Sequence, residues 1–115
     1  MREDKHMINF PQDFLWGTST SGPQTEGRFA GDGKGDNLWD YWYQVEPHRF
    51  RFQEGPGLTS TFYENWEEDI ELLVETGHTA FRTSIQWSRI FPEGRGEANP
   101  AGVAFYRQVF ERIKE

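Results

Sequence analysis

Arg82 is the residue whose chemistry places the strongest demand on its surroundings. It lies in the middle of the extended pattern Thr79–Ile85, where the alternation of side chains puts it on the same face as Ala80 and Ser84. A guanidinium cannot shed its charge, so its burial on an inward strand face requires a carboxylate partner. No acidic residue of the chain is obviously placed to serve, and the sequence leaves the partner of Arg82 open.

The segment Gly31–Asp36 combines glycine, lysine and aspartate and could suggest a phosphate-binding loop. It lacks the spacing of such a loop and no helical pattern follows it directly, so we interpret it as a solvated turn. Asp32, Asp36 and Asp40 could suggest a site for a hard cation, but their spacing does not give the alternating ligands of a calcium loop. We therefore expect neither a metal nor a cofactor, and the lack of cysteine excludes a thiolate metal site.

Two repeats of a strand followed by a helix would position these residues. Strands are predicted at Phe14–Thr18 and Thr79–Ile85, the second of them rich in β-branched and aromatic residues. Apolar residues recur at helical spacing over Phe62–Thr76 and Val103–Lys114, each of which follows one strand. The order strand, helix, strand, helix predicts an α/β fold with a parallel sheet and right-handed crossovers.

Local signals indicate where the helices begin and end. The segment Thr59–Thr61 offers candidate N-caps for the first helix, and Gly77 can adopt the left-handed conformation that ends it. Asn99 is a candidate N-cap of the second helix, with Pro100 in its first turn. The stretch between the first strand and the first helix is interrupted by glycine and proline, and we expect it to be a long connection.

The composition argues against several classes of function. In the 115 residues, 12 Lys and Arg oppose 19 Asp and Glu, and the net charge of −7 argues against a nucleic-acid partner. No apolar run approaches the roughly 20 residues of a membrane span, and the first residues lack the apolar stretch of a signal peptide, so we expect a cytoplasmic protein. Aromatic residues make up 17% of the chain, which suits a ligand pocket and an aromatic-rich core equally well.

Four segments carry a resemblance to a known family. They read FLWGTSTSGPQTEG at 14–27, GDNLWD at 35–40, WEEDI at 66–70 and FRTSIQWSRIFP at 81–92. In this order and spacing they resemble glycoside hydrolase family 1, the family of β-glucosidases and 6-phospho-β-glycosidases, over nearly the whole chain. The segments 22–24 and 59–66 resemble the bacterial 6-phospho-β-glucosidase branch most closely.

The resemblance implies a (β/α)8 barrel that hydrolyses β-glycosidic bonds with retention of configuration. Retaining enzymes use two carboxyl groups about 5 to 5.5 Å apart, one as nucleophile and one as acid/base. In the family both are Glu, at the ends of the fourth and seventh strands, so no catalytic residue is expected in this chain. We expect residues 1–115 to be the first two βα units, the N-terminal βαβα portion of a single TIM barrel domain, and the chain to be truncated.

The resemblance also implies roles for single residues. Gln24 matches the glutamine that hydrogen-bonds glycone hydroxyls, and its amide both donates and accepts. Arg82 matches the arginine beside the nucleophilic Glu, which would be the missing carboxylate. Trp87, just past the second strand, lies where barrel active sites are built and is a candidate substrate contact. Glu26 matches neither catalytic residue, and we interpret it and His78 as structural.

Two hypotheses from different classes follow. The first is an enzyme, the N-terminal part of a 6-phospho-β-glucosidase or β-glucosidase in carbohydrate catabolism, with a β-glucoside or 6-phospho-β-glucoside as its substrate. The alternative is a non-catalytic quarter-barrel that binds sugar weakly at most, or associates with other chains. A reading frame that continues with strand-end Glu residues would favour the enzyme, and a stop codon would favour the alternative. The sequence does not determine the oligomeric state.

Overall fold

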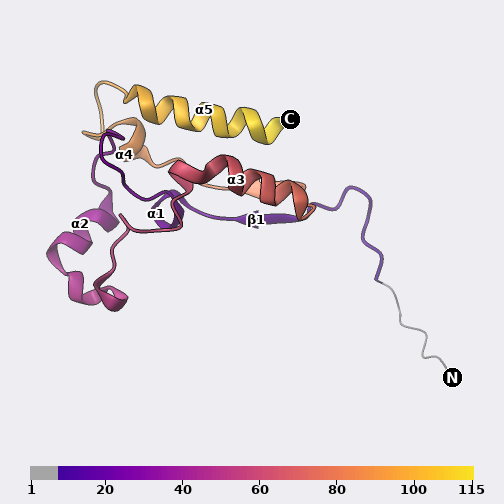
Figure 1. Ribbon diagram of the computed structural model, residues 1–115, viewed down its shortest axis with the longest axis horizontal. Helices are drawn as coiled ribbons and strands as arrows, with labels where there is room; N and C mark the ends of the chain where they lie inside the picture. Colours follow the sequence, from indigo (N-terminus) through magenta and orange to yellow (C-terminus); the bar gives the residue numbers. More distant parts are fainter. Residues whose placement is uncertain (1–7) are drawn as a thin grey trace.

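The computed structural model describes residues 8–115, and these form a short parallel sheet with helices on one side (Figure 1). In chain order the elements are β1 (Gly17–Ser19), α1 (Gly22–Thr25), α2 (Leu38–Val45), the 3-10 turns η1 (Pro47–Arg49) and η2 (Arg51–Gln53), α3 (Phe62–Glu75), β2 (Ala80–Arg82), α4 (Trp87–Ile90) and α5 (Pro100–Lys114). The predicted order of strand, helix, strand and helix is therefore present. None of the helices in the described part combines the length and apolar character that crossing a membrane requires.

The sheet pairs β1 with β2 in parallel, with Gly17 opposite Ala80 and Ser19 opposite Arg82. Both strands are shorter than predicted, and β1 begins at Gly17 rather than at Phe14. The reason is that a strand is defined by its hydrogen bonds to a neighbouring strand. In this sheet each strand has one neighbour, and the two pair over only three residues. The apolar pattern upstream of Gly17 predicts extended backbone, which is not the same as a paired strand.

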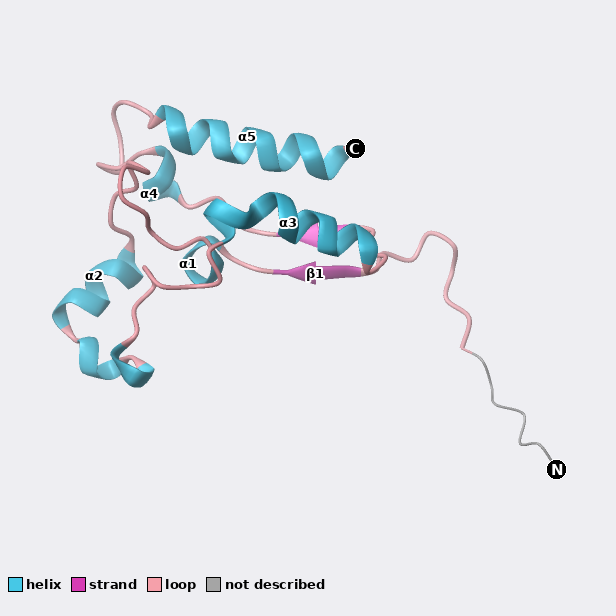
Figure 2. Cartoon of the chain, in the orientation of Figure 1, coloured by secondary structure: helices cyan, strands magenta, loops and turns pink. Residues whose placement is uncertain are grey.

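Helices α3 and α5 pack together on one face of the sheet, as Figure 2 shows. The buried core lies where they meet and consists of Phe62, Ile70, Phe105, Tyr106 and Val109. The strands contribute Phe81 to this cluster. Phe62, Ile70 and Tyr106 belong to the predicted apolar stripes, whereas Phe105 and Val109 lie outside the stripe of Val103, Tyr106, Phe110 and Ile113 predicted for the second helix. The buried face of α5 is therefore rotated from the predicted one and consists of Gly102, Phe105, Tyr106 and Val109.

The helix-end signals are confirmed with one exception. Asn99 caps α5 by accepting from the Ala101 amide, and Gly77 ends α3 with a φ of +75°. Thr61 occupies the N-cap position of α3, but its backbone is left-handed and its side chain caps no amide. The prediction of a hydroxyl N-cap in the segment Thr59–Thr61 is therefore wrong in its chemistry, although the helix begins where it was expected.

The predicted long connection contains α1, α2, η1 and η2, which the sequence analysis did not find. Helix α2 begins with a capping box, because Asn37 accepts from the amides of Trp39 and Asp40 while the Asp40 carboxylate accepts from the Asn37 amide. That signal is legible in the sequence, as asparagine followed three residues later by aspartate. The four-residue helices α1 and α4 are single turns that no periodicity reveals.

Candidate functional site

The residues predicted to contact substrate lie just past the carboxyl ends of the two strands. Gln24 is in α1, which follows β1, and Trp87 begins α4, which follows β2. The Gly22 amide donates to the Ser84 hydroxyl at 3.0 Å and ties α1 to the segment that leaves β2. A Cβ at Gly22 would overlap the Gln86 side chain, so glycine permits this close approach.

Gln24 is exposed, and its Oε1 accepts from the Ser21 hydroxyl at 2.7 Å. It borders a cavity of about 510 Å³ between α1 and the segments on either side of η2. Trp39, Phe50 and Pro56 give this cavity apolar walls, and Glu54 adds a carboxylate. The free amide group of Gln24 therefore lies beside an opening in which a small polyhydroxylated molecule has room.

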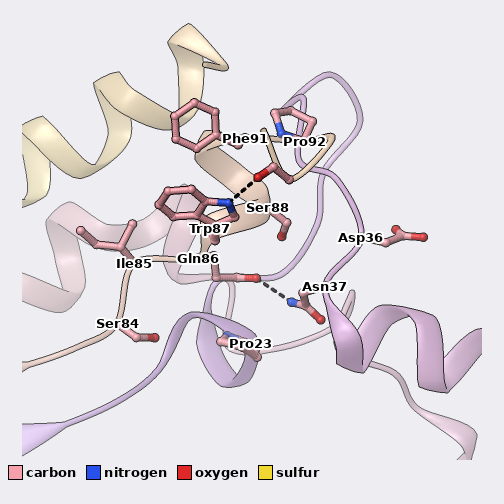
Figure 3. A pocket seen from close by; sticks show the side chains of 11 residues that line it. Pro23, Asp36, Asn37, Ser84, Ile85, Gln86, Trp87, Ser88, Phe91 and Pro92 are labelled. Carbon is pink, nitrogen blue, oxygen red and sulfur yellow. Dashed lines mark hydrogen bonds between the residues drawn. The ribbon is translucent and has the colours of Figure 1, made fainter. Parts of the chain in front are cut away.

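Trp87 borders a second cavity of about 330 Å³, shown in Figure 3. Its ring is 62% exposed, packs against Phe91 with ring centroids 4.8 Å apart, and donates from Nε1 to the Gly94 carbonyl at 2.8 Å. Asn37 and Gln86 lie at the rim, joined by a hydrogen bond of 2.7 Å from Asn37 Nδ2 to Gln86 Oε1 (Figure 3). Ser88 also lines this cavity, and its buried Oγ has no hydrogen-bond partner among residues 8–115.

The two cavities border different predicted residues and share Pro23 as a common wall. The structure thus brings Gln24 and Trp87 to the same end of the sheet but does not place them around one opening. Arg82 lies apart from both, since it lines neither cavity. Its side chain is exposed and makes no hydrogen bond or ion pair with residues 8–115, while its carbonyl accepts from the Thr20 amide at 2.9 Å.

Beneath the strand ends lies a buried polar cluster that centres on Glu26. One carboxylate oxygen of Glu26 accepts from Arg89 Nε at 2.7 Å and from Gln86 Nε2 at 2.9 Å, and the other accepts from the Tyr106 hydroxyl at 2.5 Å. Glu26 is 1% and Arg89 0% exposed. Because every oxygen of the Glu26 carboxylate is engaged inside the fold, the geometry agrees with its structural interpretation.

Asp32 completes the neutralisation of Arg89. Arg89 Nη1 donates to Asp32 Oδ2 at 3.1 Å, and Nη2 donates to the Gly27 carbonyl at 2.9 Å. Burial by itself raises the pKa of Asp32, but hydrogen bonds from the Lys34 and Phe29 amides and the charge of Arg89 outweigh it. The pKa of Asp32 therefore lies below its ordinary value, and the carboxylate stays charged beside the guanidinium.

The interpretation of Gly31–Asp36 as a solvated turn needs correction. Asp32 and Asp40 are each only 6% exposed, and Lys34 forms a buried ion pair with Asp40. Asp36, the most exposed of the three aspartates, forms an ion pair with Arg28, with 2.6 Å between Asp36 Oδ1 and Arg28 Nη1. Each carboxylate is thus engaged by a basic side chain of the same chain, because the turn folds inward over Arg89 instead of projecting into water.

The cluster of Glu26, Asp32, Gln86, Arg89 and Tyr106 was missed by the sequence analysis, apart from the structural interpretation of Glu26. Its members are spread over 80 residues of sequence, so no local spacing links them. One signal was available: Arg89 stands in the mostly apolar segment Trp87–Pro92, and burial of its charge there would require a buried acid.

Comparison with known proteins supplies the context for this arrangement. Residues 6–115 match the family model described as glycosyl hydrolase family 1. The chain is 52% identical over 104 residues to the 6-phospho-beta-glucosidase GmuD of Bacillus subtilis, covering 90% of this chain and 22% of that protein. It is 38% identical over 117 residues to beta-glucosidase A of Acetivibrio thermocellus, covering 94% of this chain and 24% of that protein.

Solved structures give the same picture in three dimensions. An aphid myrosinase superposes with a TM-score of 0.87 at 31% identity, over 93% of this chain and 23% of that one. A family 1 β-glucosidase from Thermotoga maritima superposes with a TM-score of 0.84 at 35% identity, over 91% of this chain and 23% of that one. The chain thus spans under a quarter of the length of these relatives and has the fold of the N-terminal βαβα portion of their TIM barrel. It belongs to glycosyl hydrolase family 1.

Proposed function

We propose that residues 1–115 form the first two βα units of a single barrel domain that hydrolyses 6-phospho-β-glucosides with retention of configuration. The observation that carries the proposal is the 52% identity, over 90% of this chain, to a relative named as a 6-phospho-beta-glucosidase. A sugar phosphate does not cross membranes freely, so such an enzyme would meet its substrate in the cytoplasm.

In this proposal Gln24 contacts the glycone. Its amide offers a donor and an acceptor to neighbouring hydroxyls of one sugar, and it is exposed beside the larger cavity. A glycone there would compete with Ser21, whose hydroxyl now donates to Gln24 Oε1. The contact would orient the sugar without forming or breaking a bond.

Arg82 would stand beside the catalytic nucleophile. Retaining hydrolysis uses two carboxyl groups about 5 to 5.5 Å apart, and both would come from later strands of the barrel. A guanidinium within about 4 to 6 Å of a carboxylate lowers its pKa and keeps it ionised for attack on the anomeric carbon. The exposed, unpaired side chain of Arg82 among residues 8–115 supports this role, because it is free to accept such a partner.

Trp87 would provide an apolar ring face to the substrate. Sugar rings stack on aromatic faces through their C–H bonds, and the Trp87 ring is 62% exposed at the smaller cavity. The buried hydroxyl of Ser88, which has no partner within the described part of the chain, is a hydrogen-bonding group that a hydroxylated ligand in this cavity could satisfy.

A second candidate function is a non-catalytic quarter-barrel that binds sugar weakly or associates with other chains. The observation in its favour is the exposure of large apolar side chains near the sheet, such as Trp16 at 48% and Ile85 at 52%. A surface of this kind favours association.

Two chimeric enzymes test the proposal. In the first, the Bacillus chimera, residues 1–115 replace the matching N-terminal part of the Bacillus subtilis relative. In the second they replace the matching part of beta-glucosidase A of Acetivibrio thermocellus. The family resemblance implies that the residues that bind the 6-phosphate would lie outside these 115 residues. Each chimera is therefore compared with its own parent on that parent's aryl glycoside, with and without the 6-phosphate.

We expect the Bacillus chimera to keep its parent's kcat/KM for the aryl 6-phospho-β-glucoside within about tenfold, a loss of about 1.4 kcal/mol in transition-state binding. The second chimera should lose a larger share of its parent's kcat/KM. In that chimera, residues 1–115 with Gln24 come from a different branch of the family than the remainder of the chain. The opposite order would contradict the assignment to 6-phosphoglucosides, and two folded but inactive chimeras would contradict the enzymatic function.

A further inference from the structure

The cavity beside Gln24 extends well beyond that residue. Its volume of about 510 Å³ lies within the range of roughly 300 to 1,000 Å³ in which pockets enclose molecules of drug size. In the proposed function Gln24 contacts the glycone, so the rest of the cavity faces the leaving group of the substrate. This second part is bordered by Trp39 of α2 and by Phe50, Glu54 and Pro56 on either side of η2.

Glu54 brings a charge to this part of the cavity. In the described part of the chain it is the one charged residue that borders the opening. Its exposed carboxylate makes no ion pair and no hydrogen bond with residues 8–115. Arg51 does not neutralise it, because the Arg51 guanidinium lies over the Phe52 ring, 4.8 Å from the ring centroid. A ligand in the cavity therefore meets a negative charge on the border formed by these residues.

Tyr43 fixes the backbone on both sides of Glu54. The Tyr43 hydroxyl donates to the Gln53 carbonyl at 2.7 Å, and a Cβ at Gly55 would overlap the Tyr43 ring. Phe52 and Gln53 both have a φ of +57°, a left-handed conformation that is unfavourable for these residue types and persists only where the surroundings impose it. Glu54 thus stands on a rigid segment, as a group that discriminates between ligands must.

Aromatic rings and a carboxylate together distinguish ligands by charge. Trp39 is 48% exposed, and the Phe50 ring is held against Trp42 with centroids 5.2 Å apart. A cation is attracted both by an aromatic face and by a carboxylate, whereas a neutral hydroxyl gains a hydrogen bond to the carboxylate only. An anion is repelled. Because Glu54 is exposed, this preference should be graded and sensitive to salt.

We propose that Glu54 is a specificity-determining residue that selects the leaving group by charge. A leaving group that carries an ammonium is preferred over a hydroxylated one, and a leaving group that carries a carboxylate or a phosphate is disfavoured. This inference rests on the proposed function for its orientation, since Gln24 has to hold the glycone for the leaving group to reach Glu54. The phosphate of the substrate then belongs on the glycone, away from this carboxylate.

Three aryl 6-phospho-β-glucosides test the selection, with an aminomethyl, a hydroxymethyl or a carboxyl group para to the glycosidic oxygen. Their kcat/KM values are compared in the Bacillus chimera, in Glu54→Gln and in Glu111→Gln, an exposed position of α5 outside the cavity. In Glu54→Gln the ratio of the ammonium to the carboxylate compound should fall about fivefold to tenfold relative to the unaltered chimera. Glu111→Gln should keep the ratio, and Glu54→Lys should reverse the order.

Salt gives a check that needs no variant. In the unaltered chimera the ratio should shrink at about 1 M salt, where charges are screened within about 3 Å. Circular dichroism establishes that the variants fold, and if Glu54→Gln and Glu54→Lys do not, the salt dependence of the unaltered chimera decides. A ratio that is unchanged in folded Glu54→Gln, or that does not respond to salt, would overturn the selection by Glu54.

Binding separates this inference from the proposed function. Sulfur-linked analogues of the ammonium and carboxylate compounds resist hydrolysis, and their Kd values are measured by calorimetry in the same proteins. A chimera that cleaves none of the glycosides but binds the ammonium analogue more tightly, with the preference lost in Glu54→Gln, would contradict the proposed function and leave the charge selection intact. Equal affinity for the two analogues, or no binding of either, would refute the charge selection.

Discussion

Two arginines of one chain segment illustrate how surroundings assign a role to a residue. Arg89 is fully buried, and its charge is met by Glu26 and Asp32 at 2.7 and 3.1 Å. Arg82 is exposed and has no ion pair with residues 8–115. A buried guanidinium without an acid costs several kcal/mol, so burial of Arg82 would require a carboxylate from outside residues 8–115. Arg89 holds the fold together, while Arg82 is available for a partner.

The first prediction at this scale concerns Arg82 in the Bacillus chimera. Arg82→Ala should lower kcat by about 10² to 10⁴-fold, because the nucleophile loses the neighbouring charge that keeps it ionised and in position. The acidic limb of the pH profile of kcat/KM should move upward, as the pKa of the nucleophile rises. Arg95→Ala, an exposed arginine outside the site, is the matched control. A folded Arg82→Ala enzyme with near-normal kcat would refute the role.

The second prediction follows from the lowered pKa of Asp32. A carboxyl whose folded pKa lies below its unfolded value, about 3.9, stabilises the protein above that value and loses the contribution as pH falls through the folded pKa. We expect the unfolding free energy of the Bacillus chimera to fall below about pH 4, and less steeply in Asp32→Asn. Urea denaturation from pH 6 to pH 3 measures this, with Asp13→Asn as the exposed control. Parallel curves for all three proteins would contradict it.

At the scale of elements, the contact between α4 and α5 fixes the buried cluster. Gly102 of α5 lies directly against the Arg89 backbone, and a Cβ there would overlap the Arg89 carbonyl. Asn99 reinforces this contact, since its Nδ2 donates to the Arg89 carbonyl at 3.1 Å and to the Asp32 carbonyl at 2.9 Å. The close crossing thus holds Arg89 over the acids that neutralise it.

The third prediction is that Gly102→Ala destabilises the Bacillus chimera. In an exposed helix Ala is more favourable than Gly by about 1 kcal/mol, but overpacking against a backbone costs typically 1 to 3 kcal/mol, so the overlap should win. Ala104→Gly, at an exposed position of the same helix, should be destabilising by about 1 kcal/mol through helix propensity alone. Thermal denaturation followed by circular dichroism measures both. Stabilisation by Gly102→Ala would show that α4 and α5 lie further apart.

At the scale of the molecule, the described elements do not enclose a complete core. The radius of gyration is 18.5 Å, whereas a compact domain of 115 residues has about 13 Å. Helices cover one sheet face only, and the β1–β2 pair has no strand on either side within residues 8–115 (Figure 2). Stability and activity should therefore both depend on what covers the remaining surface.

The fourth prediction is that purified residues 1–115 do not hydrolyse an aryl 6-phospho-β-glucoside and are loosely folded. Catalysis requires two carboxyl groups held across the scissile bond, which the later strands would supply. The exposed aromatic rings should bind a hydrophobic dye, and the dye fluorescence should be higher than with the folded Bacillus chimera. Well-dispersed amide signals from a monomer would contradict the expected looseness, and turnover that persists through purification would contradict the placement of the catalytic pair.

The sequence by itself determined the order of the elements, the positions of the two long helices, the apolar stripe of the first of them and the family. The reason is physical: the period of apolar residues is set locally by helix geometry, and Asn99, Pro100 and Gly77 act on the backbone next to them. It also placed Gln24 and Trp87 just past the two strands, where the structure has them, although their contacts with substrate remain predictions.

Only the tertiary structure decided how long the strands are, where the short helices lie and which charges are buried. Strand length depends on a neighbour distant in sequence, as with Gly17 opposite Ala80. The burial of Asp32 and Arg89, 57 residues apart, follows from the packing of α4 against α5 and the inward fold of the glycine-rich turn. Local sequence patterns do not predict such contacts. The energy of these contacts arises only when segments distant in sequence pack together and exclude water.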